Sequence, residues 1–309
     1  MRTSRSAQAA TRVTIYAALA GNLAIAVTKF SAALWSGSGA MMSEAIHSII
    51  DTGNEALLLY GLACASKKPD RRHPFGYGME FYFWAFVVSL VIFALGGVLT
   101  IYEGVDRLRH PVQFKDPWIN YIVLISAFIF EFTSFRIAWR EVRKAHPTGS
   151  LWRAILISKD PGIFSVLLED FSALIGLIIA SGGFSLALLL DELRYDAVAS
   201  IAIGVLLIGI SIVIAGETRS LLIGESAGGP VVRHLRTLIM NDSRVQEVGE
   251  VLTMHFGPHD ILAAVSVDFE DNLTAAQVES AIEEMTDTLQ AEIPEIGRLF
   301  MRPMRRRSA

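Results

Sequence analysis

A polar stretch at residues 43–55, SEAIHSIIDTGNE, contains the side chains of this sequence that are best suited to bind a cation. His47 and Asp51 stand one helical turn apart, so both would project from the same face of a helix. An imidazole and a carboxylate at this spacing are typical ligands of zinc and of other first-row transition metals. The sequence therefore predicts a metal site that residues elsewhere in the chain must complete.

The polar residues of this stretch share one face of the predicted helix. At about 100° per residue they fall within roughly 120° of arc, and the opposite face is apolar. The set is Ser43, Glu44, His47, Asp51, Asn54 and Glu55. Ionisable groups in a membrane span cost about 2.5–3.5 kcal/mol each on insertion scales, so they usually serve a pathway. A helix cap with a buried polar network would explain Ser43 and Glu44, but it leaves His47 and Asp51 unexplained.

A second acidic pair, Glu169 and Asp170, lies in another apolar segment. Asp51 would lie about 15 Å into a helix that runs inward, and Asp170 about 14 Å into one that runs outward. Both would reach the middle of a hydrocarbon core about 30 Å thick. One divalent cation is the simplest partner for these two carboxylates and His47. A purely protonic relay is the alternative, and it does not require the three groups to converge.

The composition is that of a membrane protein. Of the 309 residues, 52% are hydrophobic and 19% are charged, and a soluble domain does not need several apolar runs of about 20 residues. The single cysteine, Cys64, excludes a disulfide framework and a thiolate metal cluster. The basic N-terminus superficially resembles a mitochondrial transit peptide. The first apolar run follows so closely that we expect residues 1–12 to be a cytoplasmic tail instead.

Six apolar segments are long enough to span a membrane. They are residues 13–35, 41–64, 80–105, 117–138, 161–183 and 196–223. The N-terminal tail and the loops after the second and fourth segments carry most of the loop lysines and arginines. Both termini are therefore expected in the cytoplasm, and the membrane would be the inner membrane if the source is bacterial. Asn22 and Lys29, in the first segment, are attributed to helix packing or snorkelling.

The last part of the chain, residues 227–305, has the pattern of a soluble domain. Helices are predicted at 231–240 and 274–293, and strands at 245–256, 260–269 and 298–304. This order predicts a small α+β sandwich with one helical layer on one sheet. His255 and His259 flank the turn between the first two strands and are expected to be exposed to solvent.

Four features of the chain together form a recognisable pattern. They are SEAIHSIID in the second span, HPFGYG before the third, LLEDFSALIG in the fifth, and the αββαβ tail. Together they resemble the cation diffusion facilitator family, and the signatures HPFGYGMEFYFW and SKDP–LLED indicate its zinc-transporter branch, which includes mitochondrial relatives. The resemblance implies a homodimer whose subunits each have six spans and a cytoplasmic ferredoxin-like domain for dimerisation. It also implies export of a divalent metal in exchange for protons, by alternating access.

The family's intramembrane site takes two ligands, one turn apart, from each of the second and fifth spans. His47 and Asp51 match the first pair, and Asp170 matches the lower member of the second. The remaining position holds Val166, which cannot coordinate a metal. Glu169 is the leading candidate for the fourth ligand, and water, Asn54 or Ser43 is the alternative.

Matches to other sites of the family are partial. Asp70 and His73 match two ligands of a secondary metal site in the loop after the second span, but a tyrosine stands at the third position. Glu131 and Glu44 are candidates for a proton path, and Glu169 is an alternative carrier there. The last predicted strand lacks the His and Asp ligands that the cytoplasmic domain of some members carries.

The sequence as a whole predicts proton-coupled efflux of a divalent cation. Zinc is the expected metal, and the ligand types also suit manganese, iron, cobalt and nickel. No cofactor is expected besides this cargo. The expected partners are the cation, protons, the lipid bilayer and a second copy of the chain, and no nucleic acid. The alternative is an intramembrane metalloenzyme that uses the same His/Asp site, although no HExxH motif occurs. A tethered soluble binding module would leave the polar second span unexplained.

Overall fold

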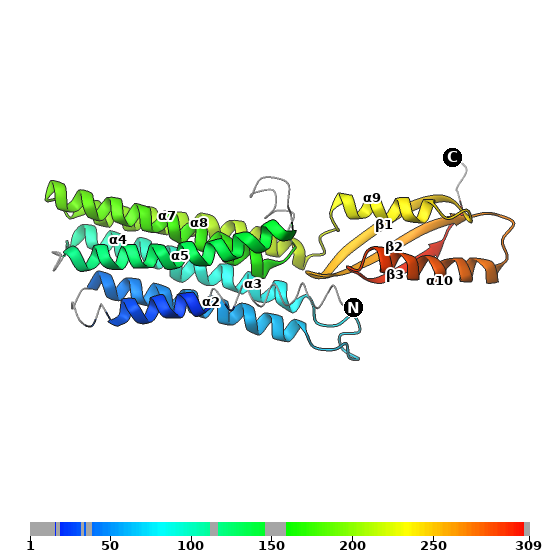
Figure 1. Ribbon diagram of the computed structural model, residues 1–309, viewed down its shortest axis with the longest axis horizontal. Coiled ribbons are helices and arrows are strands. Elements are labelled where there is room, and N and C mark those ends of the chain that lie inside the picture. The colour runs from blue at the N-terminus through cyan, green and yellow to red at the C-terminus, as the bar shows by residue number, and fades with distance from the viewer. Residues whose placement is uncertain are drawn as a thin grey trace. The chain divides into compact units, whose positions relative to one another are not determined.

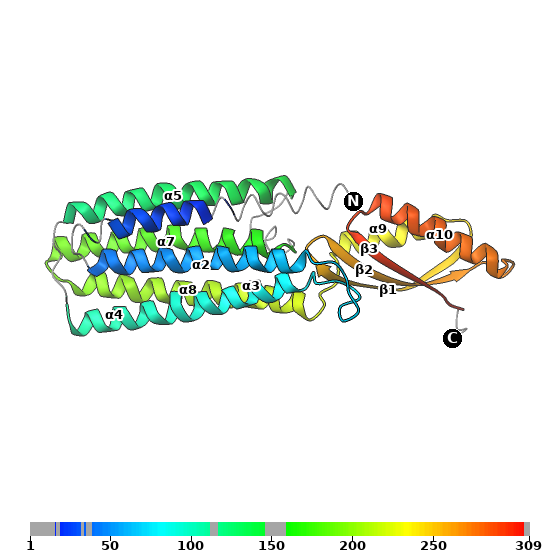
Figure 2. The same cartoon turned by 90° about the horizontal axis from the view of Figure 1, so that it is seen from below.

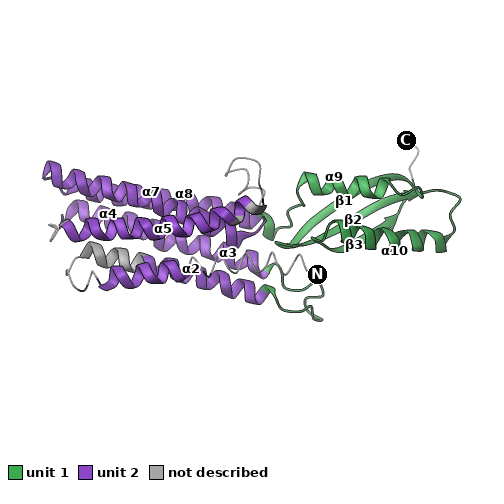
Figure 3. Cartoon of the chain, in the orientation of Figure 1, with its two compact units in different colours: residues 1–9, 65–79, 220–309 green, residues 10–64, 80–219 purple. Residues whose placement is uncertain are grey.

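The structure is a computed structural model, and it describes residues 16, 19–31, 34, 39–111, 117–145 and 159–305. The chain forms two compact units (Figure 3). One contains residues 10–64 and 80–219, and the other joins the loop at 65–79 to residues 220–309. The predicted tail at 1–12 lies outside the described residues, and the predicted first span lies partly outside them. The domain boundaries predicted from the sequence stay a prediction.

The unit that contains the predicted spans is a bundle of long helices that run side by side (Figures 1 and 2). Its helices are α2 (Gly39–Ala65), α3 (Glu80–Val91), η1 (Ile92–Val98), α4 (Leu99–Arg109), α5 (Pro117–Ala145), α7 (Pro161–Leu190) and α8 (Arg194–Leu222). Residues 19–31 are also helical. The segments α3, η1 and α4 form one continuous helix, because η1 is a π-helical stretch after which Leu99 N–H donates to the Ala94 carbonyl.

Four helices among the described residues are long and apolar enough to cross a membrane. They are Glu80–Arg109, Trp118–Arg140, Pro161–Leu190 and Arg194–Leu222, which correspond to the third to sixth predicted spans. Large apolar side chains on these helices, such as Trp118, Ile122 and Leu189, are exposed, as lipid-facing side chains are. Helix α2 has 27 residues but carries the polar face, so the number of six spans stays a prediction.

Local sequence fixes where α7 begins. Asp160 accepts a hydrogen bond from Gly162 N–H at 3.0 Å, and Pro161 follows it as the first helical residue. The helix ends at Asp191, which takes the left-handed conformation with φ of 51°. This capped start sets the position of the acidic pair Glu169 and Asp170 along the helix.

Glycines allow α8 to touch the continuous helix α3–η1–α4 along the backbone. A Cβ atom on Gly204 would lie 2.6 Å from Ile101 and 2.9 Å from the Gly97 carbonyl oxygen. A Cβ atom on Gly104 would lie 3.0 Å from the Ala197 carbonyl oxygen. Such approaches require small residues, and they are a common way for membrane helices to pack.

We expect Gly204→Ala to lower the melting temperature of the detergent-solubilised protein, whereas Gly209→Ala should not. Ala is favoured over Gly in a helix by about 1 kcal/mol, and nothing lies within 4 Å of a Cβ on Gly209. At Gly204 the added methyl group meets backbone, and overpacking costs about 1–3 kcal/mol. Thermal unfolding of the two variants measures the difference, and equal melting temperatures would contradict the proposed contact.

The other unit contains a small sheet with two helices. Its elements are α9 (Gly229–Met240), β1 (Val245–Gly257), β2 (Asp260–Phe269), α10 (Ala275–Glu292) and β3 (Ile296–Pro303). The sheet order is β1-β2-β3, with β1 antiparallel to β2 and β2 parallel to β3. Helix α10 is the crossover that the parallel pair requires. The order of elements predicted from the sequence is confirmed.

The core of this unit lies between the sheet and its helices. Leu235 and Ile239 of α9 and Met285 and Leu289 of α10 are buried in one cluster with side chains of the strands. One layer of helices therefore covers one face of the sheet, as the hydrophobic pattern predicts.

One expectation about the sheet is wrong. His255 was predicted to be exposed, but it is 5% exposed, and His259 is half-buried. The chain that enters this unit from α8 runs along β1, where the Glu225 carbonyl accepts a hydrogen bond from His255 N–H at 3.1 Å. The hydroxyl of Thr253 likewise accepts one from Ala227 N–H at 3.0 Å. The alternation of apolar and polar residues along a strand does not show that another segment of the chain will cover it.

Candidate metal-transport site

A hydrogen bond joins the polar face of α2 to the acidic pair on α7. Asn54 Nδ2 donates to Glu169 Oε1 at 2.9 Å, and both side chains are buried. Asn54 lies on the same predicted face as Asp51, so this bond draws the two helices together at the level of their acids. The hydrogen bond leaves the second oxygen of Glu169 available for another contact.

Helix α5 contributes the side chains that surround Asp170. Asp170 is buried, Ser134 of α5 hydrogen-bonds to it, and the charges of Glu131 and Asp51 act on it. Glu131 and Ser134 are three residues apart, so they share one face of α5. The structure therefore brings Asp51, Asp170 and Glu131 into one electrostatically connected region.

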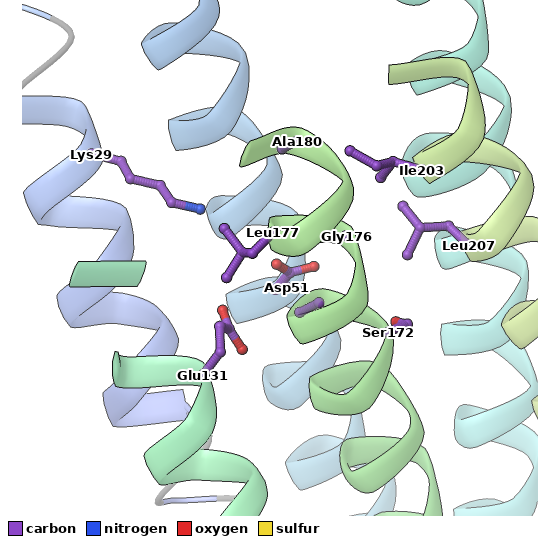
Figure 4. A pocket seen from close by; sticks show the side chains of 10 residues that line it. Lys29, Asp51, Glu131, Ser172, Gly176, Leu177, Ala180, Ile203 and Leu207 are labelled. Carbon is purple, nitrogen blue, oxygen red and sulfur yellow. The ribbon is translucent and has the colours of Figure 1, made fainter. Parts of the chain in front are cut away.

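A small cavity of about 50 Å³ lies in this region, which is enough for a water molecule. Lys29, Asp51 and Glu131 line it together with residues of α7 and α8. Figure 4 shows the carboxylates of Asp51 and Glu131 extending from α2 and α5 toward the same space, with the Lys29 ammonium group reaching in from the helix at 19–31. Lys29 is 5% exposed, and its Nζ donates to Ser48 Oγ at 3.0 Å.

Negative charge dominates the interior of the bundle. Among the described side chains of the bundle, four acids of this region are buried, whereas Lys29 is the one buried cation. The acids are Glu55, Glu131, Glu169 and Asp170. Removing one ion from water costs several kcal/mol even after relaxation, unless it is well paired. The remaining charge must be balanced by protons or by metal cations. The site is therefore suited to hold either kind of cation.

The described side chains do not by themselves form a complete metal centre. No three His, Cys, Asp or Glu side chains among them are grouped as ligands of one ion. His47 and Glu44 lie on α2, but their side chains are not among those described. Val166 is buried on α7. The ligand set His47, Asp51, Asp170 and Glu169 thus stays a prediction.

The sequence analysis assigned no functional role to three residues of this region. Asn22 Nδ2 donates to Glu55 Oε1 at 2.8 Å, and both side chains are buried. Lys29 reaches the acidic cavity rather than snorkelling to an interface. The position of Glu55, one helical turn after Asp51, was the available signal for it. For Asn22 and Lys29 the only signal was polarity within an apolar run.

Asp70 organises the loop between α2 and α3. Its Oδ1 accepts hydrogen bonds from the N–H groups of Arg72 and His73 at 2.8 and 2.7 Å. Its Oδ2 accepts one from the Tyr77 hydroxyl at 2.7 Å, and this bond is the main cause of the lowered pKa of Asp70. Both carboxylate oxygens therefore serve the fold of the loop. The secondary metal site at Asp70 and His73 stays a prediction.

The same loop is anchored to the sheet by a cluster of one arginine and two phenylalanines. Phe75 packs against Phe256 of β1 with ring centroids 5.3 Å apart, and the Arg298 guanidinium lies over both rings at 5.4 and 6.0 Å. Arg298 also donates to Asp260 Oδ2 at 3.2 Å. The backbone of Gly78 approaches the Phe256 carbonyl so closely that a Cβ atom would collide with it.

We expect Arg298→Gln to loosen this loop. The substitution removes the cation over both rings and the charged contact with Asp260. Trypsin should then cut the intact protein at least several-fold faster after the basic residues at 67, 71 and 72. Arg233→Gln, an exposed position on α9, is the control. Unchanged cleavage at the loop would contradict the role of Arg298 in anchoring it.

Comparison with known proteins gives matches over most of the chain. Residues 15–223 match the family model of the cation efflux transmembrane domain. The human mitochondrial proton-coupled zinc antiporter SLC30A9 is 32% identical over 244 residues, which are 78% of this chain and 43% of that protein. Metal tolerance protein C4 of Arabidopsis thaliana is 28% identical over 258 residues, 82% of this chain and 56% of that protein.

A bacterial relative is similar over nearly its whole length. The manganese efflux system protein MneP of Bacillus subtilis is 21% identical over 289 residues, 92% of each protein. The chain spans less than half the length of the human zinc antiporter. All three relatives are named for transport or metal tolerance, none as an enzyme, which leaves the metalloenzyme alternative without support.

Proposed function

Because the chain belongs to the cation efflux, or cation diffusion facilitator, family of metal transporters, we propose that it exports a divalent metal cation in exchange for protons. The surplus of buried acids over buried cations supports this proposal most directly. A site that must always hold positive charge can exchange metal for protons as it turns from one side of the membrane to the other.

The proposed transport site lies at mid-membrane between α2 and α7. Its ligands are His47 and Asp51 of α2 and Asp170 of α7, with Glu169 as the fourth. The interaction of Asp51 with Asp170 and the bond from Asn54 to Glu169 support convergence of these helices. Zinc is the preferred cargo because the human relative is named a zinc antiporter. The name of the Bacillus relative makes manganese the second candidate.

The proposed architecture follows the family resemblance. The helix at 19–31 and α2 would complete six spans, and two copies of the chain would associate through their C-terminal sheet units. Both termini would lie in the cytoplasm, and the membrane would be the inner membrane if the source is bacterial. Glu131 and Glu44 would carry protons, and the metal would be cargo, with no cofactor.

Both helices of the site should be needed for transport. We expect Asp51→Ala and Asp170→Ala each to lower metal uptake into proteoliposomes at least tenfold, because each removes one of the few charged ligands. Asp191→Asn, at the exposed end of α7, should transport normally. Near-normal flux in a folded Asp51 or Asp170 variant would place the site elsewhere.

A proton gradient should drive the flux. Metal ligands must be deprotonated to bind the cation, so protons arriving from an acidic outer side should displace it there. In proteoliposomes with the membrane potential clamped, an imposed gradient, acid on the side that receives the metal, should accelerate zinc movement. A zinc flux that is indifferent to this gradient would exclude antiport.

A further inference from the structure

Two buried amides each hold one oxygen of a buried acid. Asn22 Nδ2 donates to Glu55 Oε1 at 2.8 Å, and Asn54 Nδ2 donates to Glu169 Oε1 at 2.9 Å. All four side chains are more than nine-tenths buried, since the most exposed of them, Glu169, is 8% exposed. Each amide therefore fixes the orientation of its carboxylate inside the bundle.

Three further oxygens of this group accept no hydrogen bond from the described residues. They are Glu55 Oε2, Glu169 Oε2 and Asn54 Oδ1. The charges of Glu55, Asp51 and Asp170 all act on Glu169, and Glu55 directly follows Asn54, whose side-chain amide holds Glu169. Buried acceptors without donors are rare in folded proteins and costly. A positive charge among these oxygens would remove that cost.

We propose that Glu55, Asn54 and Glu169 form an oxygen-only binding position for a hard divalent cation, of which manganese is the transported candidate. Carboxylate and amide oxygens are the ligands that manganese, magnesium and calcium prefer. Zinc favours four-coordinate sites in which nitrogen or sulfur takes part. Glu55 would thus be a determinant of metal preference, one helical turn along α2 from Asp51.

This inference rests on the proposed transport function and deepens it. Glu169 belongs both to this position and to the predicted set with His47, Asp51 and Asp170. A zinc ion held by His47 depends less on Glu55 than a manganese ion held by oxygens alone. Removing the charge of Glu55 should therefore weaken manganese binding far more than zinc binding.

The test compares wild-type protein with Glu55→Gln, using the full chain purified in detergent and stripped of metal with a chelator. Glutamine keeps the size of the side chain and an oxygen that can accept from Asn22. Free Mn²⁺ is measured by electron paramagnetic resonance during titration, and zinc affinity is measured by competition. Glu103→Gln is the matched control, since Glu103 is a half-buried acid on α4 outside this group.

We expect Glu55→Gln to weaken manganese binding at least tenfold and zinc binding less than threefold, with Glu103→Gln unchanged. Melting temperature with and without Mn²⁺ gives a second readout, because a bound ion stabilises the folded state. Wild type should be stabilised by Mn²⁺, and the Glu55 variant should not.

Manganese binding within twofold of wild type in Glu55→Gln would overturn the inference and indicate that the two glutamates hold protons. An equal loss of zinc and manganese would overturn the oxygen-only assignment. In either case the transport function stands if the wild-type protein moves metal into proteoliposomes. It fails separately if the wild-type protein moves no metal.

Discussion

Burial of several acids inside one helical bundle is the constraint on which the rest of this structure depends. Four polar side chains hydrogen-bond to these acids or to Lys29. Asn22 bonds to Glu55, Asn54 to Glu169, Ser134 to Asp170 and Ser48 to Lys29. Each of these polar groups would be costly in lipid without its partner. Among the described residues, Glu55, Glu169 and Asp170 each keep one oxygen that accepts no hydrogen bond, which suits the proposed exchange of one bound cation for another.

The sequence predicted the helices and the small sheet well because both follow hydrophobic periodicity. It also predicted a common depth for Asp51 and Asp170 along two helices, and their convergence on one metal ion stays a prediction. It did not identify the partners of these acids, because a hydrogen bond such as Asn22 to Glu55 depends on which helices are neighbours and on their rotation. The hydrophobic periodicity of a single helix reveals neither which helices are its neighbours nor how they are rotated.

The unit that contains the sheet shows the same limit of prediction from sequence. Strand alternation located β1 and β2, but His255 became buried because residues 224–227 run along β1. The anchoring of Phe75 by Arg298 and Phe256 joins positions more than 180 residues apart in the sequence. Such contacts belong to tertiary structure, and the glycine-rich loop motif HPFGYG indicated only that a tight turn was present.

The glycine contacts between α8 and α3–η1–α4 bear on how the bundle can change shape. At Gly97, Gly104 and Gly204 the backbones of the two helices approach closely, and an isoleucine side chain of the facing helix packs directly against each glycine. Sliding or rotating one against the other would drive carbonyl oxygens into neighbouring side chains and backbone. The pair would therefore act as a fixed frame. Movement that opens the acids first to one side and then to the other would have to come from α2, α5 and α7, the helices that carry them.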